Sequence, residues 1–181
     1  MGKNRKTVRN SYSKEFFDGL NKKIRDWVEF SFGYTPDDYL TDDELDFIFQ
    51  QMENSETTLT RVEEAERNFE KEVEDEMGWY DIVEPKVGDT FNFNGKLKAF
   101  SKTEKATRDF MRRYMKDRKN LIIYRLPEGT QHFDVQKYDN YFDEEKESWV
   151  KSNGYVIAGI EDVSKQFAHK RVQIVDLEPI K

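Results

Sequence analysis

Cysteine is absent from this chain, and histidine occurs only twice, at His132 and His169. Without cysteine there is no disulfide-stapled scaffold, no cysteine-ligated zinc or iron–sulfur centre and no thiol nucleophile. Two histidines are too few for a metal centre built from imidazole ligands, so we expect no bound metal. We interpret both histidines as surface or structural residues rather than catalytic ones.

Long apolar runs are also missing. No segment approaches the roughly 20 apolar residues that a membrane-spanning helix requires. Residues 1–14 are polar and do not lead from a basic segment into an apolar one, as a secretion signal does. We therefore expect no membrane association, and the absence of cysteine adds the expectation of a reducing cytoplasm.

Common nucleotide-binding and hydrolase motifs do not occur in the sequence. It contains no GxGxxG, no P-loop GxxxxGK, no GxSxG and no HExxH. If the chain binds a nucleotide, it therefore does so without a Rossmann or P-loop cradle.

Charge is plentiful but unevenly distributed. The net charge of -7 disfavours extensive nucleic-acid binding. The first fourteen residues nevertheless carry five basic side chains and no acidic one, whereas residues 63–76 are strongly acidic. We expect residues 1–12 to form a flexible basic arm, which either solubilises the chain or contacts an acidic partner or nucleic acid.

The aromatic content predicts a folded core in spite of the high charge. With 14 phenylalanines, nine tyrosines and three tryptophans, the chain has the apolar surface for one domain. Helical patterns come first and strand patterns dominate the second half, which is typical of an α+β fold with mainly antiparallel strands. We predict a single domain over residues 13–181, with a helical part at 13–56 and a β-rich core at 57–181.

Local signals place several elements. Apolar spacing predicts a helix over residues 13–32, and the capping box Thr41-Asp42-Asp43-Glu44 begins a second helix. A short strand is expected at 57–62, followed by a charged helix from Glu63 to Met77, although a helix from Leu59 onward also fits. A further capping box at 101–104 predicts a helix to about residue 119, and strands are expected at 121–126, 149–151, 155–160 and 172–177.

Two glutamates two residues apart, Glu145 and Glu147, precede one of the expected strands. If Glu147 opens that strand, both side chains project from the same face, because alternate residues of a strand share a face. Two carboxylates would then serve one cleft, an arrangement suited to a cationic or glycosidic substrate. A solvated surface pair is the simpler interpretation in a chain that is 37% charged.

The order of several short motifs resembles the R-S-E class of mono-ADP-ribosyltransferases, of the arginine-specific type. The motifs are Thr60-Arg61-Val62, Gly88-Asp89-Thr90-Phe91, Ala99-Phe100-Ser101 ahead of a helix, and Glu145-Lys146-Glu147. The resemblance extends from Ser13 to Leu177. Two positions differ from the family pattern: Ala99 replaces a serine, and Val62 replaces the glycine that often follows the arginine.

The resemblance implies a split core of two mainly antiparallel β-sheets with N-terminal helices. It also implies transfer of ADP-ribose from NAD to an accessible arginine of a target protein, with release of nicotinamide. Glu147 would stabilise the positive charge that develops on the ribose, and Glu145 would hold the arginine acceptor. Short chains of this type resemble intracellular effectors such as those of bacteriophages, which would act in the host cytoplasm.

Further roles follow from the same resemblance. Arg61 would bind the diphosphate of NAD, Ser101 would position its ribose, and Tyr141 and Phe142 would meet the target protein. Each residue also has a purely structural interpretation: Arg61 would pair with Glu63, Ser101 would cap a helix, and the two aromatic residues would pack in the core.

Two other functions remain open for the chain as a whole. It could be a non-enzymatic interaction protein of the same fold that binds a basic partner. It could also be an ADP-ribosyltransferase that acts on nucleic acid, or an NAD hydrolase.

Overall fold

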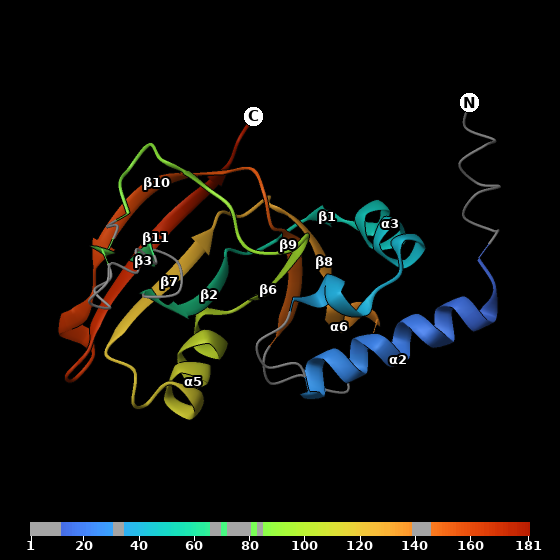
Figure 1. The fold of residues 1–181 in the computed structure, drawn as a ribbon, viewed down its shortest axis with the longest axis horizontal. Helices are drawn as coiled ribbons and strands as arrows, with labels where there is room; N and C mark the ends of the chain where they lie inside the picture. The colour runs from blue at the N-terminus through green and yellow to red at the C-terminus, as the bar shows by residue number, and fades with distance from the viewer. Residues whose placement is uncertain (1–11, 31–34, 66–69, 72–80, 83–84, 139–145) are drawn as a thin grey trace, which may run out of the picture.

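The computed structural model describes residues 12–30, 35–65, 70–71, 81–82, 85–138 and 146–181 (Figure 1). Residues 1–11 of the expected basic arm lie outside this set, as do Tyr141, Phe142 and Glu145. Within the described part, helices dominate up to residue 51 and strands dominate from residue 53 onward. The predicted α+β class is thereby confirmed.

The helices of the described residues are mostly short. They are α2 (Lys14–Phe30), α3 (Asp42–Gln51), α5 (Glu104–Tyr114) and α6 (Val135–Tyr138), with 3-10 helices η1 (Pro36–Tyr39) and η2 (Ser164–Gln166). In α2, Leu20, Ile24 and Trp27 recur at helical spacing and are buried on one face. None of the described helices is long and apolar enough to cross a membrane.

The start of α3 is fixed by the capping box that the sequence predicted. Thr41 Oγ1 accepts a hydrogen bond of 3.2 Å from the backbone N–H of Glu44, and Glu44 Oε1 accepts one of 2.9 Å from the backbone N–H of Thr41. The same carboxylate forms an ion pair with Lys23 of α2. Glu44 therefore both begins α3 and links it to α2.

Within the described residues, nine strands form one sheet in the order β1-β8-β9-β6-β2-β7-β11-β10-β5. Among its described pairs, only β7 with β11 is parallel. The strands are β1 (Glu53–Asn54), β2 (Leu59–Glu64), β5 (Thr90–Phe91), β6 (Leu97–Ser101), β7 (Asn120–Leu126), β8 (Gln131–Asp134), β9 (Glu147–Lys151), β10 (Tyr155–Asp162) and β11 (Arg171–Pro179). A separate pair joins β3 (Glu70–Lys71) and β4 (Asp81–Ile82).

The nine-stranded sheet is divided where β2 meets β6. These two strands share one registered pair, Thr60 with Ser101. In contrast, β2 is registered with β7 over six residues and β6 with β9 over five. A single registered pair thus connects the strand pairing of two halves, β1-β8-β9-β6 and β2-β7-β11-β10-β5. This is the split, mainly antiparallel core that the resemblance implied.

Different helices cover the two halves. Ile24 of α2 and Ile48 of α3 share a buried cluster with Trp149 of β9. Met111 of α5 shares another with Ile123 of β7. Figure 1 shows α2 and α3 at one end of the molecule and β10 and β11 at the other. At the junction, Ala99 of β6 belongs to the first cluster and Val62 of β2 to the second.

The predicted charged helix from Glu63 to Met77 is wrong at residues 63–64 and 70–71, although Ala65 between them is helical. Glu63 and Glu64 belong to β2, where they pair with Ile122 and Leu121 of β7, and residues 70–71 form β3. Glutamate favours helices in isolation, but pairing with a buried central strand outweighs that preference here.

Candidate active site

Glu147 and Ser101 lie opposite each other at the junction of the two halves. Glu147 is the first residue of β9, Ser101 is the last residue of β6, and the two are registered partners. Ser101 is also the partner of Thr60 on β2. Directly opposed residues of antiparallel strands share a face, so Thr60, Ser101 and Glu147 form a row across three strands. The structure thus brings together two of the predicted site residues.

The carboxylate of Glu147 is held inside the protein. The residue is 6% exposed, and its Oε1 accepts a hydrogen bond of 2.8 Å from Nε1 of Trp27 on α2. Trp27 packs edge-to-face against Tyr39 and Trp149. Charges interact more strongly in a water-poor site than in bulk water, so a carboxylate at this position is suited to opposing a cation.

The backbone immediately before Glu147 is not extended. Lys146 has a φ of 50°, in the left-handed region that few residues other than glycine adopt. Its carbonyl accepts a hydrogen bond of 2.8 Å from the backbone N–H of Lys102. The expectation that Glu145 and Glu147 share a face assumed extended backbone through Lys146, so that reasoning does not apply here. Glu145 itself lies outside the described residues, as do Tyr141 and Phe142.

Ser101 does not cap a helix. The N-cap of α5 is Thr103, whose side chain accepts a hydrogen bond of 3.2 Å from the backbone N–H of Ala106. Two residues earlier, Ser101 still belongs to β6. The capping interpretation of Ser101 is therefore wrong, and the residue keeps its place beside Glu147.

Arg61 follows Thr60 on β2 and reaches from one half of the sheet to the other. Its Nε donates to Glu63 Oε1 at 2.7 Å, and its Nη1 donates to the carbonyl of Ala99 on β6 at 2.9 Å. Lys98 also pairs with Glu63, at 3.1 Å. The expected pairing of Arg61 with Glu63 is thus present. Within the described residues, the Arg61 side chain is thus hydrogen-bonded to Glu63 and Ala99.

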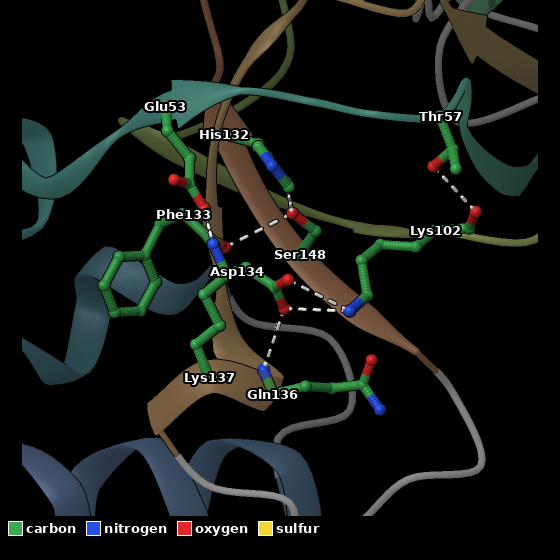
Figure 2. A network of polar contacts seen from close by, with 9 residues as sticks. All are labelled: Glu53, Thr57, Lys102, His132, Phe133, Asp134, Gln136, Lys137 and Ser148. Atoms are coloured by element: carbon green, nitrogen blue, oxygen red, sulfur yellow. Dashed lines mark hydrogen bonds and ion pairs between the residues drawn. The ribbon is translucent and has the colours of Figure 1, made fainter.

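A buried polar contact fixes the residue after Glu147. Ser148 is fully buried, and its Oγ hydrogen-bonds with Nδ1 of His132 on β8 (Figure 2). Because the Ser148 hydroxyl donates to the carbonyl of Phe133 at 3.2 Å, it accepts from His132, and Nδ1 carries the proton. The serine hydroxyl is therefore a structural group and not an activated nucleophile.

A second contact in the same region joins Lys102, the residue after β6, to β8. Lys102 Nζ pairs with both carboxylate oxygens of Asp134, at 3.0 and 3.1 Å (Figure 2). The Lys102 carbonyl accepts a hydrogen bond of 3.0 Å from the hydroxyl of Thr57. Since the Lys102 N–H also binds the carbonyl of Lys146, this lysine stabilises the backbone from which β9 begins.

His132 makes the stability of the fold depend on pH. Burial lowers its pKa from 6.5, against the opposing effect of Asp134 and Glu53. Below pH 6.5 the unfolded chain therefore takes up a proton that the folded chain refuses, so the free energy of unfolding falls as pH decreases through this range. Above this pH range both states hold His132 neutral, and the free energy of unfolding no longer depends on its protonation.

We expect the free energy of unfolding to be lower at about pH 5.5 than at about pH 7.5, and His132→Gln to remove much of this difference. Denaturant titration at both pH values measures it. His169→Gln, at an exposed position, is the control and should leave the slope unchanged. Glu44, with a pKa lowered from 4.5, loses its contribution only at lower pH and does not interfere. Equal slopes for wild type and His132→Gln would refute the assignment.

Sequence reasoning missed the contacts that surround Glu147. The predicted helix over residues 13–32 contains Trp27, but no local pattern indicated a partner 120 positions away. Sequence reasoning also left His132 as a surface or structural residue without a partner. Burial now confirms the structural interpretation of His132.

Several solved structures of ADP-ribosyltransferases are similar to this chain. Plx2a, a toxin from Paenibacillus larvae, matches 97% of this chain and 90% of its own with a TM-score of 0.55 and 14% identity. C3stau2 from S. aureus, solved with NAD, matches 93% and 89% with a TM-score of 0.55 and 12% identity. Vis from Vibrio splendidus, solved with agmatine, matches 91% and 68% with a TM-score of 0.50 and 11% identity.

No protein-family model matches the sequence, and no curated protein matches it at a significant level. At identities of 11 to 14%, the structural similarity shows a common fold and no more than that. The chain therefore has the fold of the ADP-ribosyltransferase toxins, as the resemblance implied. Its row of Ser101 and Glu147 lies at the junction of the split sheet of that fold.

Proposed function

We propose that this chain transfers ADP-ribose from NAD to an arginine side chain of a target protein and releases nicotinamide. The observation that carries the proposal is the pairing of Ser101 with Glu147 at the junction of a split sheet of the ADP-ribosyltransferase fold. The motif order in the sequence points to the same two residues without reference to the structure.

Glu147 is the residue assigned to transition-state stabilisation. When the bond between nicotinamide and ribose breaks, its electron pair leaves with nicotinamide and positive charge builds up on the ribose ring, as in other glycosidic cleavages. A fixed carboxylate opposes this charge more strongly in the transition state than in the ground state. The buried, hydrogen-bonded position of Glu147 supports this role. Ser101, its registered partner, positions the ribose.

Arg61 is assigned to the diphosphate of NAD. Arg61 and Lys98 both pair with the carboxylate of Glu63, so two cationic groups lie close together at this position. The guanidinium group offers a rigid set of donors that suits anionic oxygens, and the Arg61 side chain is 30% exposed. A bound diphosphate competes with Glu63 for these donors.

Glu145 is assigned to the acceptor. A guanidinium nitrogen of the target arginine attacks the ribose carbon, one carbon–nitrogen bond forms as another breaks, and the proton lost by the guanidinium passes to Glu145. Tyr141 and Phe142 meet the target protein. The place of these three residues just ahead of β9 supports the assignment, as does the agmatine in the Vis structure, because agmatine carries the guanidinium group of arginine. The absence of cysteine fits action in a reducing cytoplasm. If the chain is a phage effector, that cytoplasm is the cytoplasm of the host.

The acceptor is tested with two small molecules of similar length. We expect incubation with NAD and agmatine to give ADP-ribosyl-agmatine, detected by mass spectrometry, and incubation with cadaverine to give no adduct, because its amines lack the guanidinium that Glu145 is proposed to hold. Nicotinamide release without an agmatine adduct would reject the arginine-type acceptor and favour NAD hydrolysis. Equal ADP-ribosylation of agmatine and cadaverine would reject the proposed preference for a guanidinium acceptor.

A further inference from the structure

The hydrogen bond between Trp27 and Glu147 joins the N-terminal helical part to the catalytic strand. Trp27 Nε1 lies 2.8 Å from Glu147 Oε1, and the two residues are 7% and 6% exposed. The indole N–H can only donate, and its acceptor is a carboxylate oxygen. Hydrogen bonds to charged groups are stronger than those between neutral groups. A helix that packs on the sheet thus places a donor directly on the proposed catalytic group.

The orientation of Trp27 is fixed by its surroundings. Its ring packs edge-to-face on Tyr39 of η1 at 6.0 Å and on Trp149 of β9 at 6.3 Å. Its helical neighbours Leu20 and Ile24 are also buried in the cluster that joins α2 to β6 and β9. The indole donor is therefore set in place before any substrate binds, which is the property that makes a polar contact useful in catalysis.

Ala99 has a side chain that cannot donate a hydrogen bond, and it lies on the same face of the sheet as Glu147. Ala99 precedes Ser101 by two residues on β6, so both side chains lie on the same face as Glu147. Its methyl group cannot donate a hydrogen bond, and it belongs to the same buried cluster as Trp27. Ala99 of β6 supplies no hydrogen-bond donor to this face of the sheet. The indole of Trp27, on α2, supplies one to Glu147.

We propose that Trp27 is a positioning residue of the active site, which fixes the Glu147 carboxylate in the orientation required to oppose the ribose cation. This inference rests on the proposed function. With Oε1 held by the indole, rotation of the carboxylate about its last carbon–carbon bond is restricted, and the direction of its second oxygen is set as well. Loss of the donor then lowers the rate of the chemical step more than it lowers the affinity for NAD.

Trp149 provides a matched control. It is 1% exposed in the same cluster, and its Nε1 makes no hydrogen bond with the residues that the structure describes. Trp27→Phe and Trp149→Phe each remove a buried indole, but only the first removes a donor from Glu147. We expect Trp27→Phe to lower kcat for nicotinamide release by roughly tenfold to a hundredfold with little change in KM. Trp149→Phe keeps an aromatic ring against Trp27, so it should lose stability but keep kcat within about threefold of wild type.

A measurement that does not require turnover separates this inference from the proposed function. In wild-type protein, the indole ¹H–¹⁵N resonance of Trp27 should lie downfield and should move upfield in Glu147→Gln, while that of Trp149 stays in place. An unmoved Trp27 resonance, equal kcat losses in the two Trp→Phe variants, or a loss confined to KM would each overturn the inference. If the wild type releases no nicotinamide but the Trp27 resonance moves as expected, the proposed function is wrong. The hydrogen bond between Trp27 and Glu147 is then still confirmed.

Discussion

Replacement of Glu147 by glutamine is expected to lower the rate of nicotinamide release from NAD by about a hundredfold to a thousandfold. Glutamine keeps the size of the side chain and an oxygen that accepts the Trp27 N–H, but it removes the negative charge that opposes the ribose cation. Because that charge acts chiefly in the transition state, kcat should fall much more than KM rises. Nicotinamide is quantified by chromatography over a range of NAD concentrations.

The fold of this variant must be verified before its rate is interpreted. Glu147 is buried and hydrogen-bonded, but glutamine can keep the contact with Trp27, so the thermal midpoint should change little. Ser101→Ala, which alters the registered partner and leaves the charge in place, should be less damaging than Glu147→Gln. Undiminished turnover in well-folded Glu147→Gln would remove Glu147 from the chemistry.

The second large effect is expected from Glu145→Gln, which should abolish transfer to arginine and leave slow hydrolysis of NAD. The proposed role of Glu145 is to hold the guanidinium acceptor and to take its proton, and neither task is needed when water attacks the ribose. Agmatine transfer and nicotinamide release are measured in the same reaction with the same preparation. The ratio of transfer to release, rather than either rate alone, carries the result.

An acidic residue of the described surface serves as the comparison for this variant. Glu128 is exposed in the turn between β7 and β8, and Glu128→Gln should change neither rate by more than a few-fold, as expected for a surface charge. If Glu145→Gln lowers transfer and release equally, Glu145 has no acceptor-specific role. If it behaves like Glu128→Gln, it is a solvated neighbour of Glu147.

Local signals in the sequence predicted much of the fold, because they depend on contacts within a few residues. Thr41 and Glu44 form a capping box with each other, so their spacing alone located the start of α3. The helix after residue 101 was also predicted, but its cap is Thr103 and not Ser101. Both residues can accept a hydrogen bond from a helix terminus, but the pairing of Ser101 with Glu147 and with Thr60 extends β6 far enough to exclude Ser101 as the cap.

Contacts between distant segments were beyond the reach of local patterns. The strand at Glu63 and Glu64 depends on β7, which lies more than 50 residues further along the chain. Trp27 and Glu147 are likewise joined only by the packing of α2 on β9. The resemblance assigned both Ser101 and Glu147 to one site because it compared the order of motifs and not their local propensity. It gave no indication that an indole from α2 would hold the carboxylate.

The central claim is that this chain cleaves the bond between nicotinamide and ribose in NAD by means of Glu147. Its most direct test is the time course of nicotinamide formation by purified wild-type protein with NAD and agmatine, run beside Glu147→Gln. We predict steady formation of nicotinamide by the wild type and a rate lower by about a hundredfold or more in the variant. Absence of nicotinamide formation at millimolar NAD, or equal rates in both proteins, would contradict the claim.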